Sequence, residues 1–280
     1  MAIGEAWDNI RSNYRFHAGL RGGRAARLAY VTVYFLIFIL FRRGDRHLRA
    51  LNWLKALGLS DRRVLVETPD GVVLDVDLHT AFDPLYSIVA RREYESETGF
   101  ALRPGLTVMD LGANVGVFAT RAARLAGPEG RVIAVEPHPD NFRRLEANAR
   151  RNGLDRLVCV QAAAGDHDGE AALYVHERAI NHSLVRGSGR SVTVPLRTVD
   201  SLARELGLTK LDLLKIDIEG AVPAALRGAS ETLRRLRPLV VLERDAGEEN
   251  AGVDEFFRAH GYRWIDVSVF TFARPDILVG

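Results

Sequence analysis

A glycine turn and an acid that follows it are the first residues of this chain whose types and spacing suggest chemistry. The turn reads DLGANVG over Asp110–Gly116, after a short apolar run, and Glu136 comes 24 residues after Gly112. Gly112 and Gly116 would let the backbone approach a ligand closely, where a Cβ atom would clash. A carboxylate at the position of Glu136 can accept hydrogen bonds from both ribose hydroxyls. Together these residues indicate a nucleoside cofactor.

The charge of the turn favours one cofactor over another. Proteins that bind a dinucleotide usually carry GxGxxG, whereas this turn reads GANVGV, with Asn114 and Val117 at the third and sixth positions. The carboxylate of Asp110 would repel a pyrophosphate and would suit a cation. S-adenosylmethionine has an amino group, a sulfonium and no phosphate, so we predict S-adenosylmethionine rather than NAD. The alternative is that Asp110 only ties the loop by hydrogen bonds.

A second group of ionisable residues lies in the segment LLKIDIEG, residues 213–220. If this segment is a strand, alternation places Lys215 and Asp217 on one face and the isoleucines on the other. A strand in the middle of a parallel sheet is normally apolar on both faces, and buried charges are unfavourable unless they are paired or used. Lys215 and Asp217 are therefore predicted to be catalytic. The alternative is a structural ion pair of Lys215 with Asp217 or Glu243.

Alternating strands and helices must position these residues. The predicted strands are 106–111, 131–135, 157–163, 211–217 and 238–242, and the predicted helices are 116–125, 139–152, 199–206, 221–236 and 253–260. Residues 170–196 look like a β insertion with a polar loop, and 262–267 with 269–278 like a terminal antiparallel pair. This order predicts an α/β fold with a doubly wound, Rossmann-like, mostly parallel sheet. Such sheets bind ligands at the carboxyl ends of their strands.

The residues before this pattern predict two further parts of the chain. Two alternating runs in 64–78 flank Pro69-Asp70-Gly71, which predicts a β-hairpin, and residues 84–101 have helical spacing. We therefore divide the chain into a basic helical segment over 1–60, a hairpin and helix over 61–105, and an S-adenosylmethionine-binding domain over 106–280.

The basic segment surrounds an apolar run. Residues 1–60 hold ten Arg or Lys and three acids, a net charge of +7, and the other 220 residues carry −5. Thirteen of the 14 residues in 28–41 are apolar, but as a helix they would span about 21 Å of about 30 Å of bilayer hydrocarbon. Three interpretations stay open: a shallow membrane anchor through residues 20–50, a helix packed on the body or on a second subunit, and a transmembrane span.

Composition argues against several classes of protein. The single cysteine, Cys159, excludes an intrachain disulfide framework and a Cys-cluster zinc site, and it indicates a reducing compartment. We therefore predict a cytoplasmic protein, peripheral or anchored at the cytoplasmic membrane if residues 20–50 bind there. The arginines flank an apolar block and form no basic stripe with stacking aromatics, so nucleic-acid binding is not predicted.

Three motifs in sequence order resemble the FkbM family of S-adenosylmethionine-dependent methyltransferases: DLGANVG, VEPHPDNFRRL and DLLKIDIEGA. The segments YESE, AAAGDHDGEAAL, NHSLV and VPLRTVDSL support the resemblance, which covers residues 84–245. The resemblance implies a doubly wound methyltransferase fold and O-methylation of a sugar or polyketide hydroxyl.

The same resemblance implies two sets of site residues. In the first set, Asp110, Gly112, Asn114 and Gly116 line the methionine end of the cofactor. Glu136 holds the ribose, Pro137 shapes the turn after it, and Asp166 lies near the adenine. The second set, Lys215, Asp217 and Glu219, faces the reaction centre. The family usually has an acid where this chain has Val222, which we expect on the helix after the fourth strand.

The implied reaction is an in-line attack of a hydroxyl oxygen on the sulfonium methyl, with a neutral thioether as leaving group. The enzyme must align the reacting atoms and can remove the hydroxyl proton. Asp217 is the predicted base or orienting group, and His182, in a polar loop, is a second candidate. Alternatively, Mg²⁺ held by Asp217, Glu219 and Glu243 would acidify the hydroxyl.

Two other functions stay open at this point. The chain could be an NAD-dependent Rossmann oxidoreductase, or a non-catalytic, membrane-tethered module that binds S-adenosylmethionine. As an enzyme it would act on a hydroxyl-bearing glycan, glycolipid or polyketide, and the basic segment suits a membrane-linked acceptor. The sequence leaves open whether the protein is a homo-oligomer.

Overall fold

The computed structural model describes residues 62–77, 80, 88–89, 100–174, 190–218, 220–243, 252–267 and 270–275. The chain divides into two compact units, 1–96 and 97–280, each of which is described by itself. The apolar run 28–41 and most of the predicted helix 84–101 lie outside the described residues. Within those residues, no helix has the length and apolar character needed to cross a membrane.

The first unit contains the predicted hairpin. β1 (Arg63–Glu67) pairs antiparallel with β2 (Val73–Asp77). Thr68 organises the turn, because its hydroxyl oxygen accepts a hydrogen bond from the Val72 N–H at 3.2 Å and its carbonyl oxygen accepts one from the Gly71 N–H at 2.9 Å. The buried side chains of the pair are Val66, Leu74 and Val76.

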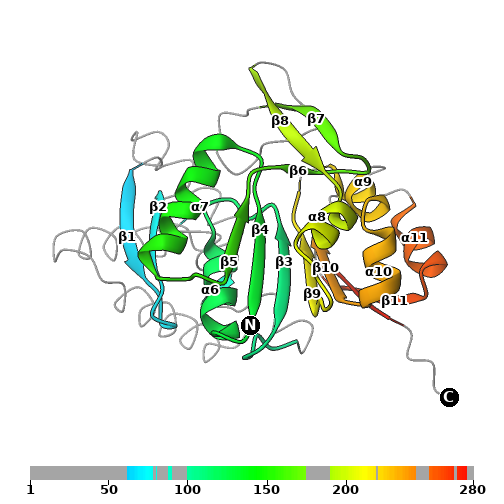
Figure 1. Cartoon of the computed structure of the whole chain (residues 1–280), viewed down its shortest axis with the longest axis horizontal. Coiled ribbons are helices and arrows are strands. Elements are labelled where there is room, and N and C mark those ends of the chain that lie inside the picture. The colour runs from blue at the N-terminus through cyan, green and yellow to red at the C-terminus, as the bar shows by residue number, and fades with distance from the viewer. Residues whose placement is uncertain are drawn as a thin grey trace, which may run out of the picture. The chain divides into compact units, whose positions relative to one another are not determined.

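The second unit is built on a seven-stranded sheet of order β11-β12-β10-β9-β3-β4-β5 (Figure 1). Its strands are β3 (Thr107–Leu111), β4 (Arg131–Val135), β5 (Leu157–Val160), β9 (Leu213–Ile216), β10 (Leu239–Glu243), β11 (Tyr262–Val267) and β12 (Phe270–Pro275). β3, β4, β5, β9 and β10 are parallel, and β12 is antiparallel to both β10 and β11. This confirms the predicted Rossmann-like sheet with its antiparallel terminal pair. The strand order reverses between β3 and β9, so the expected ligand site lies at the carboxyl ends of those strands.

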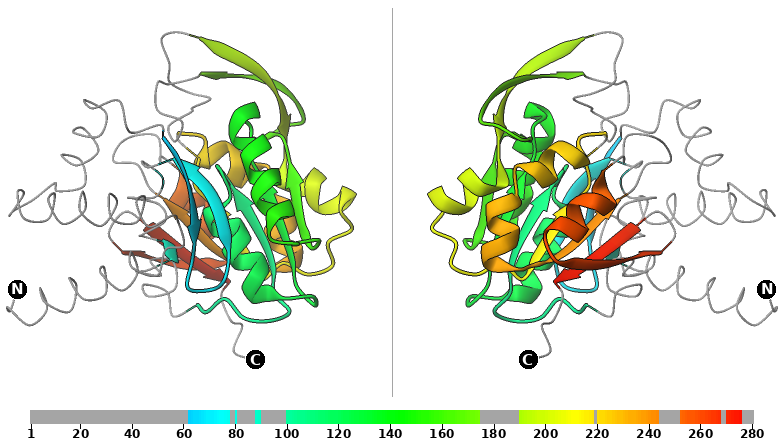
Figure 2. Two further views of the ribbon diagram at one scale, coloured as in Figure 1. Left: turned by 90° about the vertical axis from the view of Figure 1, so that its left-hand side faces the viewer. Right: turned by 90° about the vertical axis from the view of Figure 1, so that its right-hand side faces the viewer.

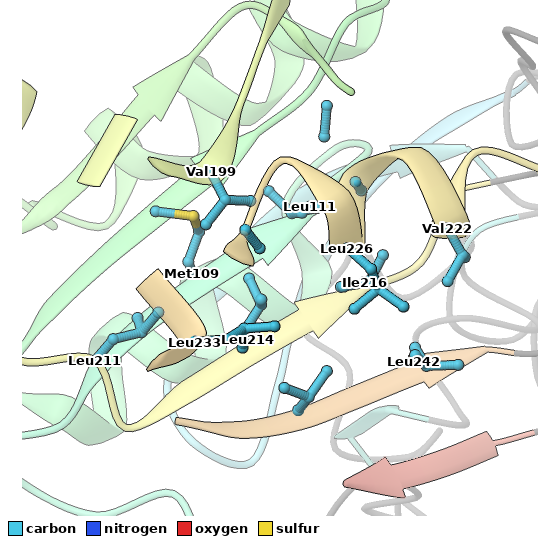
Figure 3. Close-up of a cluster of buried hydrophobic side chains, with 14 of the residues drawn as sticks. Met109, Leu111, Val199, Leu211, Leu214, Ile216, Val222, Leu226, Leu233 and Leu242 are labelled. Carbon is cyan, nitrogen blue, oxygen red and sulfur yellow. The ribbon is translucent and has the colours of Figure 1, made fainter. Parts of the chain in front are cut away.

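Helices cover the sheet and close the core. They are α6 (Val117–Ala126), α7 (Pro139–Arg151), α8 (Val199–Glu205), α9 (Val222–Arg227), α10 (Ser230–Leu236) and α11 (Val253–Ala259). The largest buried cluster joins the sheet side chains Leu111, Leu214 and Ile216 to side chains of α8, α9, α10 and α11, including Val199 and Leu226 (Figure 3). α6 and α7 pack on β3, β4 and β5 outside this cluster. The apolar strand patterns are therefore explained by burial under helices.

Two predicted elements are shorter than the sequence pattern suggested. The predicted helix 221–236 is two helices, α9 and α10, separated at Gly228. A Cβ atom on Gly228 would lie 2.0 Å from the carbonyl oxygen of Gly165, so the chain bends where the two backbones touch. The predicted strand 157–163 ends at Val160, and Ala163 begins a strand of another sheet.

That other sheet is the predicted β insertion. It has the order β6-β8-β7, with β6 (Ala163–Ala164), β7 (Gly169–Tyr174) and β8 (Ser191–Arg197). The β7–β8 ribbon projects away from the seven-stranded sheet (Figure 2). Because β6 follows closely on the end of β5, the insertion starts from the same edge at which the strand order predicts a ligand.

Candidate active site

The glycine turn links the carboxyl end of β3 to the start of α6. The Val135 carbonyl oxygen accepts hydrogen bonds from the Gly112 and Ala113 N–H groups, each at 3.0 Å. Asn114 follows with a left-handed φ of 51°, and Gly116, with φ 91°, precedes the first residue of α6. The turn is therefore fixed to the end of β4, the strand that carries Glu136.

Glu136 lies at the end of β4 and is buried. Its two carboxylate oxygens accept the Asn114 N–H at 2.8 Å and the His138 N–H at 2.9 Å. Burial raises the pKa of Glu136 to about 7, opposed by these hydrogen bonds and by one from the Asn141 side chain. A carboxylate has about four acceptor positions, and Asn114, His138 and Asn141 already use three of them, so Glu136 can hold the turn and still accept one hydrogen bond from a ligand. The structure places Glu136 beside the turn, as its spacing suggested.

The two glycines of the turn serve the protein's own packing. A Cβ atom on Gly112, whose φ is 81°, would lie 1.9 Å from the carbonyl oxygen of Asp217. A Cβ atom on Gly116 would lie 2.6 Å from Cδ1 of Leu145 in α7. At both positions the absent Cβ makes room for neighbouring parts of the chain, and the predicted close approach of a ligand stays a prediction.

A buried ion cluster joins β3 to the end of β9. The Lys215 ammonium lies 3.0 Å from Oδ1 of Asp110 and 3.0 Å from Oδ2 of Asp217. The Lys215 and Asp110 side chains are 3% and 0% exposed, whereas that of Asp217 is 38% exposed, so only Asp217 meets solvent. Burial raises the pKa of Asp110, and the neighbouring Lys215 ammonium opposes this. Two carboxylates and one ammonium leave the cluster with one net negative charge when all three are ionised.

The pairing of Lys215 with Asp217 was one of the predicted alternatives, but the pairing with Asp110 was missed. Asp110 and Lys215 face each other across the parallel pair β3 and β9. Their spacing along the chain carries no sign of this contact, because it depends on which strands are neighbours. A doubly wound strand order, in which the first strand lies beside the fourth, would have provided the signal.

The remaining predicted residues have different surroundings. Pro137 joins Glu136 to the start of α7. Asp166 follows β6 and bonds His167 and the Arg227 guanidinium, at 2.9 Å and 2.8 Å, and both lower the pKa of Asp166. Its predicted place near the adenine stays a prediction. Val222 begins α9, as expected, and it is buried in the main cluster.

The predicted metal ligands and the second base are only partly described. Glu243 ends β10 and is exposed, whereas Glu219 and His182 lie outside the described residues. Within the described ranges, no group of three His, Cys, Asp or Glu side chains could hold a metal ion. A polar residue that sequence reasoning missed is Gln161, directly after β5 at the same edge as Glu136.

Comparison with known proteins decides the family. The methyltransferase FkbM domain family matches residues 110–264, which include the glycine turn, Glu136 and the β9 cluster. This chain belongs to that family. FkbM membership implies S-adenosylmethionine as the cofactor, in agreement with the charge of the turn, and the NAD-dependent alternative is set aside.

Three individual relatives of this FkbM-domain chain share 27–30% sequence identity with it over the matched residues. The 31-O-demethyl-FK506 methyltransferase FkbM of Streptomyces tacrolimicus is 28% identical over 212 residues, covering 64% of this chain and 81% of that protein. The 2-O-methyltransferase NoeI of Sinorhizobium fredii is 30% identical over 156 residues, covering 48% and 62%. The AMB antimetabolite synthetase AmbE of Pseudomonas aeruginosa is 27% identical over 72% of this chain, which spans only 12% of that protein.

A solved structure of methyltransferase FkbM from Methylobacillus flagellatus superposes on this FkbM-domain chain with a TM-score of 0.43 and 16% identity. The match covers 70% of this chain and 54% of that one.

Proposed function

We propose that this FkbM-domain protein transfers the methyl group of S-adenosylmethionine to a hydroxyl group of a glycan, glycolipid or polyketide-type acceptor. The names of two relatives support a hydroxyl acceptor: NoeI is a 2-O-methyltransferase, and FkbM of Streptomyces tacrolimicus is a 31-O-demethyl-FK506 methyltransferase. AglP of Haloferax volcanii, a hexuronic acid methyltransferase 26% identical over 145 residues, supports a sugar-type acceptor.

One observation carries the cofactor part of the proposal. Oδ2 of Asp110 is buried and has no hydrogen-bond partner among the described residues. A buried carboxylate oxygen without a donor is unfavourable, and the cluster around it has a net negative charge. The cationic amino group of S-adenosylmethionine fits that oxygen, whereas a pyrophosphate would be repelled. The residues at the turn therefore fit this cofactor.

The residues that would hold the cofactor lie on adjacent strand ends. Asp110 and the turn up to Gly116 would hold the amino-acid end, and Glu136 would accept a hydrogen bond from a ribose hydroxyl. Gln161, one strand further, and Asp166 would lie towards the adenine. When bound, S-adenosylmethionine supplies an electrophilic methyl group on a positively charged sulfur.

Asp217 is the group proposed to act on the acceptor. It is the exposed member of the ion cluster, and it directly follows β9 at the switch point of the sheet. Its carboxylate would accept a hydrogen bond from the acceptor hydroxyl, orient the oxygen for in-line attack, and take the proton as the new carbon–oxygen bond forms. The departing thioether is neutral and needs no proton.

We propose that this transfer proceeds without a divalent cation. The Lys215 ammonium already lies 3.0 Å from Oδ2 of Asp217, so a metal ion on that oxygen would meet an existing positive charge. Methyl transfer that requires added Mg²⁺ would contradict this part of the proposal.

The test begins with binding and ends with turnover. Calorimetry should detect S-adenosylhomocysteine binding and no comparable binding of NAD. Radioactive methyl groups from S-adenosylmethionine should then appear in a crude glycolipid or glycan extract, and Asp217→Asn should reduce this transfer by about 10²–10⁴-fold, as for loss of a general base. Wild-type protein that does not bind S-adenosylhomocysteine would refute the function. Binding without transfer to a broad acceptor panel would favour the non-catalytic binding module.

A further inference from the structure

Lys215 is the one member of the ion cluster that touches both carboxylates. Its ammonium lies 3.0 Å from Oδ1 of Asp110, on the cofactor side, and 3.0 Å from Oδ2 of Asp217, on the acceptor side. It also lies 5.6 Å from the centre of the Phe118 ring in α6, the helix that begins at the glycine turn. At 3% exposure, Lys215 cannot itself reach a bulky acceptor.

Backbone contacts also hold the main chain of Asp217 beside the glycine turn. The Asp217 N–H donates to the Leu111 carbonyl oxygen at 3.0 Å, and the Asp217 carbonyl oxygen occupies the place where Gly112 would carry a Cβ atom. The main chain of Asp217 is therefore held against the cofactor turn. Holding the main chain of Asp217 does not by itself fix its carboxylate, because a side chain can rotate between staggered positions. Lys215 provides a restraint on that rotation.

We propose that Lys215 is a positioning residue whose ammonium bridges Asp110 and Asp217, so that cofactor binding at Asp110 and the placement of the Asp217 carboxylate depend on each other. This inference rests on the proposed function, because it needs Asp110 to meet the amino group of the cofactor. Lys215, predicted from the sequence to be catalytic, is thereby assigned an indirect role.

The bridge makes a specific prediction about coupling. When Asp217 is neutral, the Lys215 ammonium interacts more strongly with Asp110, and Asp110 attracts a cationic ligand less strongly. Asp217→Asn should then weaken binding of S-adenosylhomocysteine, whose sulfur is uncharged and has no direct ion pair with Asp217. In a variant that lacks the Lys215 ammonium, Asp217→Asn should have little effect on the binding of S-adenosylhomocysteine. Such coupling is reciprocal and is measured as a departure from additivity.

The experiment is a double-mutant cycle read by calorimetric titration with S-adenosylhomocysteine. Asp217→Asn should raise the dissociation constant by about five-fold in the wild-type background and by less than about two-fold in a Lys215→Met background. The matched control is Lys210→Met. Lys210 also pairs with an aspartate at 3.0 Å, Asp212, but it is 55% exposed and lies before β9, away from the turn. Lys210→Met should bind like the wild type.

A second version of the experiment is used if Lys215→Met does not fold. Loss of folding is a risk because this substitution leaves Asp110 as a buried charge without the Lys215 ammonium. If Lys215→Met is unfolded by circular dichroism, the cycle is run with Asp110→Asn, which removes the carboxylate that the ammonium would otherwise rejoin. The effect of Asp217→Asn should again shrink to less than about two-fold. An equal effect of Asp217→Asn in both backgrounds, or none in the wild type, overturns the bridge while leaving the proposed function intact. Wild-type protein that fails to bind S-adenosylhomocysteine overturns the function itself.

Discussion

Gly112→Ala is the substitution that most directly tests how the site is packed. Gly112 has φ 81°, and an added Cβ atom would lie 1.9 Å from the Asp217 carbonyl oxygen, a backbone atom. Positive φ destabilises a non-glycine residue by about 1–2 kcal/mol, and overpacking a buried contact costs about 1–3 kcal/mol. We therefore expect Gly112→Ala to lower the free energy of unfolding by about 2–5 kcal/mol.

The matched control separates the two contributions. Gly153 has φ 61°, but a Cβ atom there would meet nothing within 4 Å. Gly153→Ala should therefore show only the conformational cost, about 1–2 kcal/mol. Replacing glycine by alanine lowers the conformational entropy of the unfolded chain by the same amount in both variants, so this effect cancels in their difference. Urea unfolding of the two variants measures that difference directly.

Binding adds a second measurement to the same pair. A displaced Asp217 backbone would disturb the ends of both β3 and β9, so Gly112→Ala should also weaken S-adenosylhomocysteine binding, whereas Gly153→Ala should not. If the two variants lose equal stability, the contact between Gly112 and Asp217 does not restrain the fold, and the packing argument is refuted.

Three further predictions concern pH, metal and membrane. The pKa of Glu136 is raised from 4.5 to about 7, so its contribution to stability is present at low pH and is lost as the pH rises through about 7; Glu136→Gln should remove about 2–3 kcal/mol of this pH dependence, measured by urea unfolding at about pH 5 and pH 8. Treatment with EDTA should leave methyl transfer unchanged, and recovery of activity only on adding Mg²⁺ would contradict the metal-free proposal. If residues 20–50 bind a membrane, deletion of 1–50 should move the protein from the membrane fraction to the supernatant, and an unchanged distribution would dismiss the anchor.

The order of strands and helices could be predicted from the sequence because the apolar patterns are local. β3, β4 and β10 begin and end within one residue of the predicted strands. The prediction of one helix over 221–236 was wrong because of a contact with a distant part of the chain. Gly228 lies against the carbonyl oxygen of Gly165, more than sixty positions earlier. The helical spacing of apolar residues within a segment cannot indicate a contact with a residue so far away in the sequence.

The site shows the same division between local and distant causes. The spacing of Gly112 and Glu136 marked them as candidate site residues. It carried no sign that a Cβ atom on Gly112 would also collide with the carbonyl oxygen of Asp217, which is distant in the sequence. The charges of Asp110 and Lys215 were visible, but their pairing depends on β3 lying beside β9. Residue types thus indicated the chemistry, and strand order determined which residues meet.

The close contact of the turn with Asp217 has a consequence for the proposed reaction. In-line transfer depends on aligning three atoms, and a misplacement of about 1 Å can reduce the rate about 10²-fold. Here the backbone N–H of Asp217, the residue proposed to orient the acceptor, donates to the Leu111 carbonyl oxygen at 3.0 Å, directly before the glycine turn. A movement of the turn therefore moves Asp217 with it. In the proposed reaction, the spacing between methyl donor and acceptor would therefore depend on the parallel pairing of the buried strands β3 and β9.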